Sequence, residues 1–346
     1  MLKVKIHRFL RPLKRKWLDL EPSNVYQTYA IHRKLADRAI FYRVMKKMTF
    51  LYAEVIKDGK TVIIAPLKKR GNEYSTVGRL LGYAIGDYLM DKSLTQEEIA
   101  EAVGAIARAL RTDRLDFAGI LPDSRLKAAI DAAGFPVKTT CPMGAVYIPI
   151  GDSYDEWFHT LHKSARQNIR TAYNRAAVDG RTLDVQVLPN TKISRKLLSE
   201  LIELYIRRQN TRYGMNYSSA RKFYFKYLDF PTAYMNDPRV NYYVIMRIDG
   251  RIAGFMSGVI DKKRDCVTLV RIAFDEEYAR YSPGMIMVVE AAKSLRDRTG
   301  LHTVDMSLGG ENYKYVLGGA DYVLDAFSVT LNASPAPKAP YAPPAP

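Results

Sequence analysis

The sequence has little of what disulfide-bonded, metal-binding or membrane-spanning proteins need. It contains only two cysteines, Cys141 and Cys266, and five histidines among 346 residues. Two cysteines give neither a disulfide framework nor the spacing of a zinc site, and the close pair His159 and His162 lacks accompanying acidic or cysteine ligands. The longest apolar runs, such as residues 285–289, are far shorter than the roughly 20 residues that cross a bilayer. We therefore expect a globular chain with no bound metal.

Acidic residues are missing from the start of the chain. Residues 1–16 hold seven Lys and Arg, interleaved with apolar residues and followed by Trp17, and the whole chain has a net charge of +17. Such a segment suits an anionic membrane surface or a polyanion such as RNA, and it also fits a solvated arm resting on a domain. Without the apolar block of a signal peptide, we expect a cytoplasmic protein whose residues 1–18 allow contact with the inner face of the membrane.

The two halves of the chain follow one plan. Each has an Asp-Gly hairpin between β-rich runs, then a strand, a helix and a further strand that contains an aspartate. The corresponding residues are Asp58 and Asp249 in the turns, Thr95 and Ser282 at the helix starts, and Asp116 and Asp305 in the last strands. Spacing this similar predicts a duplicated α/β (α+β) unit, although two unrelated stretches that agree by chance remain the alternative.

The composition places the boundaries of these parts. We expect a basic amphipathic segment at 1–20, a first domain at 21–150, a second domain at 151–332 and a disordered Pro/Ala-rich tail at 333–346. The second domain opens with helices. Ser153 and Glu156 have capping-box spacing, a helix from about 163 ends near Gly180, and further helices are expected at 194–210 and 218–229.

The helix that begins near residue 163 has two different faces. Ala165, Ile169, Ala172 and Ala176 make one face apolar. The opposite face carries Lys163, Arg166, Arg170 and Asn174. This basic stripe suits a nucleotide-sugar diphosphate, a charged glycan or a tRNA acceptor stem, or is an ordinary solvated face.

The helix starts of the two halves differ in charge. In the first half, Thr95 and Glu98 form a capping box that satisfies the free amides and repels an anion. In the second half, Ser282, Pro283 and Gly284 open the helix with no acidic residue in its first turn. This pattern predicts a helix N-terminus open to a phosphate or pyrophosphate.

The same stretch carries a family resemblance. "FDEEYARYSPGM" (274–285) and "GLHTVDMSLGGENYKYVLG" (300–318) resemble the GNAT superfamily, and more closely the cellulose-biosynthesis (CelD-like) acetyltransferases of the FemAB-like group. "LHKSARQNIRTAYNRAAVDG" (161–180) resembles the helix that opens the second domain of Fem-type proteins. The resemblance implies two tandem GNAT-like domains, each a mixed, mainly antiparallel sheet flanked by helices, the second being catalytic.

The resemblance also implies an acyl donor, acetyl-CoA or another acyl-CoA, and where it binds. The residues implied for the pyrophosphate are Arg280, Tyr281, Ser282, Pro283, Gly284 and Met285. The backbone at Ala273 and Phe274 is implied for the pantetheine arm. The usual GNAT pyrophosphate pattern is incomplete, because Ser282 stands in place of its first Gly and Ala279 in place of its Gln or Arg. Fem-type relatives use aminoacyl-tRNA instead, so the donor remains open.

Acyl transfer to an amine needs a base, a stabilised oxyanion and a proton for the leaving group. We expect Glu311 as the base, Tyr313 as the proton donor and Lys314 as a contact to an anionic substrate. Asp305 is the alternative base, although its counterpart Asp116 in the other half favours a structural role. Arg271, a charge inside an apolar strand, is expected to pair with Asp305 or to face the substrate.

Three functions follow. The first is an N-acyltransferase acting on an amine-bearing sugar or on a cell-envelope or exopolysaccharide precursor, with O-acylation left open. The second is a Fem-type transferase that uses aminoacyl-tRNA in peptidoglycan synthesis. The third is a non-catalytic accessory protein of exopolysaccharide synthesis at the membrane surface.

Overall fold

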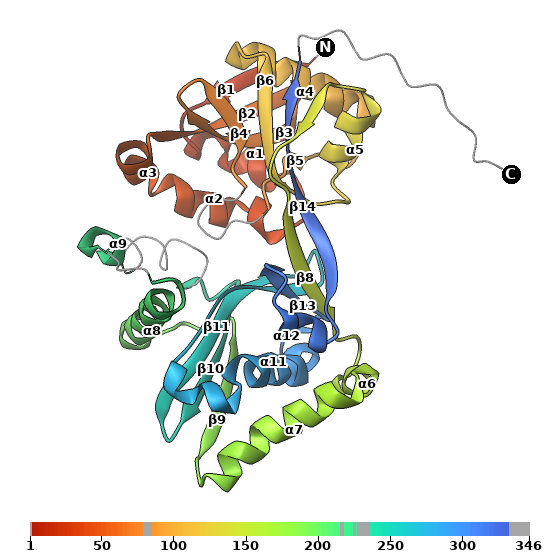
Figure 1. Cartoon of the computed structure of the whole chain (residues 1–346). Helices are drawn as coiled ribbons and strands as arrows, with labels where there is room; N and C mark the ends of the chain where they lie inside the picture. Colours follow the sequence, from red (N-terminus) through yellow and green to blue (C-terminus); the bar gives the residue numbers. More distant parts are fainter. Residues whose placement is uncertain (1, 79–84, 215–217, 224–225, 227–235, 332–346) are drawn as a thin grey trace, which may run out of the picture. The chain divides into compact units, whose positions relative to one another are not determined.

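The computed structural model describes residues 2–78, 85–214, 218–223, 226 and 236–331 (Figure 1). These residues form two compact units. Unit 1 covers the chain up to Pro22, residues 26–143 and the end of the chain from Val323, and unit 2 covers residues 23–25 and 144–322. The tail at 333–346, expected to be disordered, lies outside the described residues. Among the described helices, none combines the length and apolar character needed to cross a bilayer.

Unit 1 is a mainly antiparallel sheet with helices around it. Its strands are β1 (Lys3–His7), β2 (Met48–Lys57), β3 (Lys60–Arg70), β4 (Glu73–Thr76), β5 (Leu89–Met90), β6 (Arg114–Ile120), β7 (Val137–Thr139) and β14 (Ala320–Thr330). Within the unit the order is β1-β2-β3-β4-β6-β14, with β5 on β3 and β7 on β14. Its helices are η1 (Arg11–Leu13), α1 (Lys14–Leu18), η2 (Val25–Gln27), α2 (Tyr29–Ala36), α3 (Ala39–Lys46), α4 (Gln96–Leu110) and α5 (Arg125–Ala132).

The last strand returns to the first unit. β14 pairs with both β6 and β7, and its residues from Val323 onward belong to unit 1. The sequence division had assigned residues as far as 332 to the second domain. It missed this return because strand pairing between segments some 200 residues apart leaves no local signal.

The basic N-terminal segment is built into unit 1 and is not a loose arm. β1 pairs with β2 along its whole length. Leu13 and Trp17 are buried, with 0% and 2% of their surface exposed, and the Trp17 indole donates a hydrogen bond to the carbonyl of Gln27 at 2.8 Å. The fully buried Glu54 carboxylate accepts from the Lys16 ammonium at 2.6 Å. Part of the segment's apolar and basic character therefore serves the fold.

The described part of unit 2 is a sheet with helices on both faces. Its strands are β8 (Met143–Pro149), β9 (Leu183–Pro189), β10 (Asn241–Ile248), β11 (Arg251–Asp261), β12 (Cys266–Phe274) and β13 (Thr303–Leu308), in the order β8-β13-β12-β11-β10-β9. Its helices are α6 (Tyr154–Thr160), α7 (Lys163–Val178), α8 (Arg195–Tyr213), α9 (Ser219–Phe223), η5 (Glu276–Tyr281), α11 (Pro283–Thr299) and α12 (Asn312–Val316). Figure 1 shows α8 on one side of this sheet and α11 with α7 on the other.

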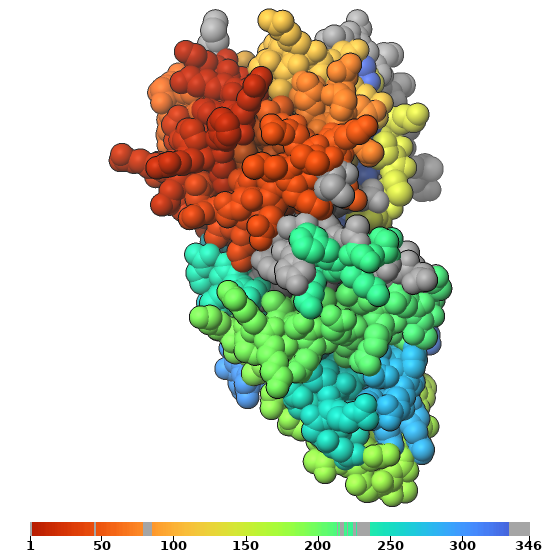
Figure 2. All heavy atoms as spheres, turned by 90° about the vertical axis from the view of Figure 1, so that its left-hand side faces the viewer, coloured from red at the N-terminus to blue at the C-terminus, as the bar shows by residue number. Residues whose placement is uncertain are grey.

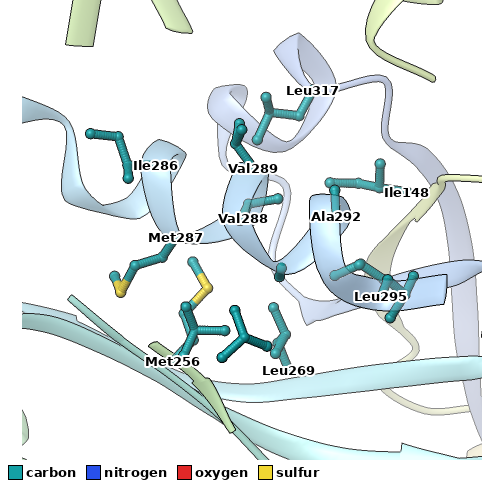
Figure 3. Close-up of a cluster of buried hydrophobic side chains, with 14 of the residues drawn as sticks. Ile148, Met256, Leu269, Ile286, Met287, Val288, Val289, Ala292, Leu295 and Leu317 are labelled. Atoms are coloured by element: carbon teal, nitrogen blue, oxygen red, sulfur yellow. The ribbon is translucent and has the colours of Figure 1, made fainter. Parts of the chain in front are cut away.

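The helix α11 anchors the core of unit 2. Most of its apolar residues are buried, and they meet side chains of the sheet and of the segment after α12 (Figure 3). Met256 on β11 and Leu269 on β12 lie beneath the helix, and Leu317 lies against its other side. A helix whose apolar side is packed in this way has little freedom to shift, so its N-terminus is held in a fixed position relative to β12.

Several local predictions are confirmed. Asp58 and Asp249 occupy the first turn position of the β2–β3 and β10–β11 hairpins with φ near +50°, as a type I′ turn requires. Thr95 and Glu98 form the expected capping box at the start of α4. The helix expected to end near Gly180 is α7. Of the helix expected at 218–229, α9 accounts for Ser219–Phe223, and most of the remainder lies outside the described residues.

The burial of Trp17 generates a stability prediction. Trp17→Ala should lower the free energy of unfolding by about 3–5 kcal/mol, because it removes a large buried ring and leaves a cavity. Phe9→Ala is the control, since Phe9 is 74% exposed and its loss should change the stability by about 0.5 kcal/mol or less. Urea denaturation measures both. Equal stability of the two variants would contradict the placement of this segment in the core.

Candidate functional site

Two neighbouring strands part in the middle of the unit 2 sheet. The parallel strands β12 and β13 pair over three rows, the last being Thr268 with Asp305, and within these described strands the pairing goes no further. β12 bulges at the same point, because Gly258 pairs with Leu269 while Ser257 already pairs with Arg271. We call this parting of the two strands the fork. Beyond it, one edge of β12 is left without a neighbouring strand.

The alternation of backbone groups shows what this edge presents. The Asp275 amide donates to the Ala253 carbonyl on β11 at 2.9 Å. In an antiparallel pair successive residues turn their amide groups to opposite sides, so Ala273 also faces β11. Ile272 and Phe274 therefore turn theirs toward the space that β13 has left. Of the two residues expected to hold a pantetheine arm, Phe274 is oriented for it and Ala273 is not.

A buried carboxylate holds the fork together. Asp305 is 1% exposed and accepts four kinds of donor. These are the Thr268 hydroxyl at 3.2 Å, the Arg264 guanidinium at 3.1 Å, the Tyr322 hydroxyl at 2.9 Å and the Ser307 amide at 2.8 Å. With its lone pairs used in this way, the carboxylate is poorly placed to take a proton from a substrate. The geometry favours the structural role for Asp305 over that of a base.

Unit 1 repeats this arrangement in reduced form. β4 and β6 are parallel and pair in one row, Ser75 with Asp116. The Asp116 carboxylate accepts from the Arg114 guanidinium at 2.8 Å and from the Ser328 hydroxyl at 2.6 Å. The aspartates matched by spacing in the sequence thus occupy corresponding positions, each at a contact between parallel strands. A feature shared by both units is a property of the fold.

The start of α11 is open, as the sequence indicated. Ser282 takes the left-handed conformation (φ 53°, ψ 52°), its side chain makes no capping hydrogen bond, and the first turn contains no acidic residue. The Ser282 amide bonds to the Ala279 carbonyl, and Pro283 has no N–H. The first amides that project from the helix are therefore those of Gly284 and Met285. A Cβ atom added to Gly284 would meet only Ile272 Cδ1, at 3.6 Å.

The turn before α11 is fixed by the end of α7. The Asp179 carboxylate pairs with the Arg280 guanidinium at 3.1 Å and accepts from the Tyr281 hydroxyl at 2.8 Å. Arg175 donates to the Arg280 carbonyl at 3.0 Å. The Tyr281 hydroxyl is therefore used in a hydrogen bond within the protein, whereas the exposed Arg280 side chain stays within reach of an anion. Both residues were expected in the pyrophosphate site, and the structure gives Tyr281 a supporting part.

Lys314 closes the loop that follows β13. It is 2% exposed, and its ammonium donates to the carbonyls of Met306, Leu308 and Gly309 at 3.2, 2.9 and 2.7 Å and pairs with Glu311 at 3.0 Å. A buried ammonium with this many acceptors holds the backbone together. The expected role as a contact to an anionic substrate does not fit its position.

The pKa values of Glu311 and Tyr313 are shifted in opposite directions. Burial opposes the ionised form of Glu311, but the hydrogen bond from Lys314 and the charges of Lys314 and Arg212, which lies 3.7 Å away, hold its pKa below the usual range. Burial and the Glu311 charge raise the pKa of Tyr313 to about 12. At neutral pH the carboxylate is ionised and the phenol protonated, which are the states that a base and a proton donor need.

The side of β12 that faces α8 carries Arg271 together with residues of α8 that the sequence did not single out. The Arg208 guanidinium lies 4.0 Å from the centre of the Phe274 ring and pairs with Glu276. The Arg271 guanidinium lies 5.7 Å from the centre of the Tyr205 ring. No local motif marks Arg208 or Tyr205, because α8 and β12 meet only after the chain has folded. Arg208 and Arg271 are both cations on this side of the fork, and Glu276 offsets the charge of Arg208.

The bulge explains the position of Arg271. Val267 and Leu269 point into the core beneath α11. Strict alternation would send Arg271 there as well, but the extra residue at the bulge turns it to the α8 face. Its expected pairing with Asp305 is wrong, since Arg264 takes that place.

The basic stripe on α7 contacts α6. The Arg166 guanidinium donates to the carbonyls of His159 and Leu161 at 2.8 and 2.7 Å, and Arg170 lies over the Phe158 ring. Lys163 is exposed. The expected apolar face of this helix is confirmed as buried. The end of α7 that reaches the turn before α11 is the opposite one, so Lys163, Arg166 and Arg170 are not brought to the fork.

Nothing in the described residues suggests a metal site, since they contain no trio of His, Cys, Asp or Glu side chains placed to hold an ion. The polar groups at the fork are backbone amides and the guanidinium groups of Arg208 and Arg271, and the segment after β13 adds the Glu311 carboxylate and the Tyr313 phenol. Such a set binds anions and moves protons. It is suited to holding a phosphorylated donor next to a nucleophile.

Comparison with known proteins agrees with this geometry. Residues 163–315 match the family model of the acetyltransferase (GNAT) domain. Among curated proteins none matches the chain. Three similar solved structures are FemX (13% identity, TM-score 0.61, covering 95% of this chain and 98% of that one), the C-terminal domain of a putative lysylphosphatidylglycerol synthetase from Agrobacterium fabrum (14%, 0.58, 94% and 93%) and a tandem GNAT protein from the clavulanic acid biosynthesis pathway (13%, 0.53, 96% and 100%).

At these identities the likeness to solved structures shows the fold alone. The chain consists of two tandem GNAT-like domains, each a mixed, mainly antiparallel sheet flanked by helices, and the second contains the matched acetyltransferase domain. The narrower likeness to FemAB-like and CelD-like proteins stays a prediction.

The role of Asp305 can be tested through stability. Asp305→Asn should lower the free energy of unfolding by about 3 kcal/mol or more, because it leaves the mostly buried Arg264 without its counter-charge. Asp116→Asn is the matched control in unit 1. Its more exposed carboxylate should contribute less, about 1 kcal/mol. Thermal denaturation followed by circular dichroism measures both. Unchanged stability of Asp305→Asn together with lost turnover would instead make Asp305 a base.

Proposed function

We propose that the protein is an acyl-CoA-dependent N-acyltransferase whose donor binds in unit 2 along β12 and at the start of α11. The GNAT acetyltransferase domain at 163–315 supports acyl transfer as the class of reaction. One observation carries the rest: β12 loses its neighbour β13 just before it leads to a helix with an uncapped N-terminus. A donor that carries an arm with amide groups and a diphosphate fits both features. The arm matches the free strand edge, and the diphosphate matches the helix N-terminus.

The donor would be held mainly by the backbone. The free edge at Ile272 and Phe274 can pair with the amides of a pantetheine arm as a neighbouring strand would. The diphosphate then lies at the amides of Gly284 and Met285, where the helix dipole adds a partial positive charge of about half a unit. Arg280 is exposed beside this terminus, and its guanidinium, which pairs with Asp179, adds further hydrogen-bond donors.

The reaction joins the nitrogen of an amine to the acyl carbon and releases the thiolate. Glu311, ionised at neutral pH, takes a proton from the attacking amine directly or through a water molecule. The departing thiolate has an ordinary pKa of about 8.5, well below the value of about 12 for Tyr313. Tyr313 therefore keeps its own proton and stabilises the thiolate by a hydrogen bond. The thiolate then takes a proton from solvent or from the base.

The acceptor is proposed to be an amine-bearing sugar or a cell-envelope precursor. Arg271 on the α8 side of β12 favours an acceptor that also carries an anionic group, such as a sugar phosphate. Arg208 and Arg212 lie on α8 itself, in ion pairs with Glu276 and Glu311. The carbohydrate itself rests on the resemblance to cellulose-associated acetyltransferases.

A second candidate follows from the charge of the chain. The net charge of +17 suits a polyanionic donor, and an aminoacyl-tRNA ester would be attacked by the same amine chemistry. Binding of charged tRNA should then weaken steeply as the salt concentration rises. Weak binding of acyl-CoA alongside salt-sensitive binding of aminoacyl-tRNA would favour this donor over CoA.

Binding of acetyl-CoA to variants at Gly284 tests the proposed donor site. Gly284→Glu should weaken binding by about 100-fold, because the new carboxylate competes for the helix terminus and repels the diphosphate. Gly284→Ala is tolerated by the protein itself, because the new Cβ atom would lie 3.6 Å from Ile272 Cδ1. Any loss of acetyl-CoA affinity in this variant therefore indicates a ligand close to the backbone. Isothermal titration calorimetry measures both. Equal affinity of wild type and Gly284→Glu would exclude a diphosphate at this terminus.

Glu311→Gln tests the base. Turnover should fall by about 100-fold or more with little change in acetyl-CoA affinity, since the variant keeps the shape but cannot accept a proton. Glu277→Gln, an exposed carboxylate on η5, serves as the control. Because the pKa of Glu311 is lowered, the wild-type rate should not reveal its protonation above about pH 5. Undiminished turnover of Glu311→Gln would contradict the assignment of the base, and an acidic limb near pH 7 that this variant lacks would contradict the lowered pKa.

A further inference from the structure

Unit 1 contains a groove that plays no part in the fork. Its volume is about 820 Å³, and it lies among β1 and the residues after it, α3, the end of α4 and the adjoining parts of β2, β3 and β4. Buried apolar residues, Leu10, Phe50 and Leu51 among them, form part of its lining. Figure 2 views the face of unit 1 that the red and orange N-terminal part of the chain forms. A groove of this size and lining can hold an apolar chain.

Large apolar side chains project from the protein beside this groove. Phe9 is 74% exposed and Ile40 73% exposed, and both line it. Val44, 66% exposed, lies one turn further along α3 on the same helix face as Ile40. Single exposed apolar residues are ordinary, but three next to an apolar groove indicate a surface that meets a partner.

The charge at the groove specifies the chemistry of that partner. Arg8, Arg43 and Lys69 line it, and its described lining residues include no Asp or Glu. Lys46 and Lys47 follow at the end of α3. A partner that fills the groove must therefore be apolar in one part and anionic in another.

We propose that this groove is a docking site for an anionic membrane surface. Phe9, Ile40 and Val44 enter the interface between headgroups and acyl chains, an acyl chain occupies the groove, and the cations on its rim contact lipid phosphates. A second copy of the chain is disfavoured, because each copy would bring the same basic rim and a net charge of +17. RNA is disfavoured because Ile40 and Val44 offer nothing to phosphates or to base stacking.

This surface differs from a linear N-terminal anchor. Leu13 and Trp17, two apolar residues of the basic segment, are in the core of unit 1 and cannot enter a membrane. α3, which the sequence did not single out, supplies two of the three projecting side chains. Removing residues 1–18 would delete β1 and Trp17 and unfold the unit, so point substitutions are needed to test the site. None of the residues involved belongs to the fork, and the proposal stands independently of the acyltransferase.

Co-sedimentation of the full chain with vesicles tests the proposal. Vesicles containing about one third phosphatidylglycerol in phosphatidylcholine should bind the wild type, and pure phosphatidylcholine should bind it at least about tenfold more weakly. The double variant Ile40→Asp/Val44→Asp should lose at least about tenfold in affinity for the anionic vesicles. Arg43→Glu should lose about fivefold or more at low salt.

Two substitutions in unit 2 are matched controls. Val178→Asp changes an apolar residue that is 85% exposed on α7, and Lys262→Glu changes an exposed cation. Both should bind the vesicles as wild type does, and all variants should keep the wild-type thermal midpoint because the positions are exposed.

Three results would overturn the docking site. The first is no binding of wild type to anionic vesicles. The second is undiminished binding of the Ile40→Asp/Val44→Asp variant, which would reduce the effect to general charge attraction. The third is a concentration-dependent dimer, measured by light scattering, that this variant abolishes, which would identify a second copy as the occupant.

Discussion

The parting of β12 and β13 is the constraint on which the rest of the unit 2 site depends. The Asp305 carboxylate ties the last paired row to Arg264, Thr268 and Tyr322, so the two strands are held together up to that row and released beyond it. The bulge in β12 lies at the same point, where a Cβ atom on Gly258 would come within 2.1 Å of the Thr268 carbonyl oxygen. The free strand edge and the open helix terminus follow from this one parting.

The duplicated plan shows why one unit carries the proposed chemistry. Both units join two parallel strands at an aspartate, but the helices that connect these strands begin differently. In unit 1 the first amides of α4 are capped by Thr95, and Glu98 in the same turn pairs with Lys57. In unit 2 the turn before α11 holds its polar groups through Asp179, which leaves the helix terminus itself open. The difference between the units is electrostatic more than topological.

The sequence predicted what short-range rules determine. Turn residues with positive φ located both hairpins, and capping residues and apolar periodicity located α4, α6, α7 and α8. It did not predict the return of β14 to unit 1, the bulge that turns Arg271 to the α8 face, or the cluster around Asp305. Each of these depends on contacts between distant segments. For the same reason Lys314 was expected to contact an anionic substrate, because the carbonyls that surround it come together only once the loop after β13 has folded.

The central claim is that the space left by β13 receives the donor as a substitute strand. A crystal structure with acetyl-CoA is the most direct test. The account predicts that the pantetheine amides bond to the backbone of Ile272 and Phe274 and that the diphosphate accepts hydrogen bonds of about 3 Å from the amides of Gly284 and Met285. A ligand bound elsewhere, with this edge and helix terminus unoccupied at saturating acetyl-CoA, would contradict it.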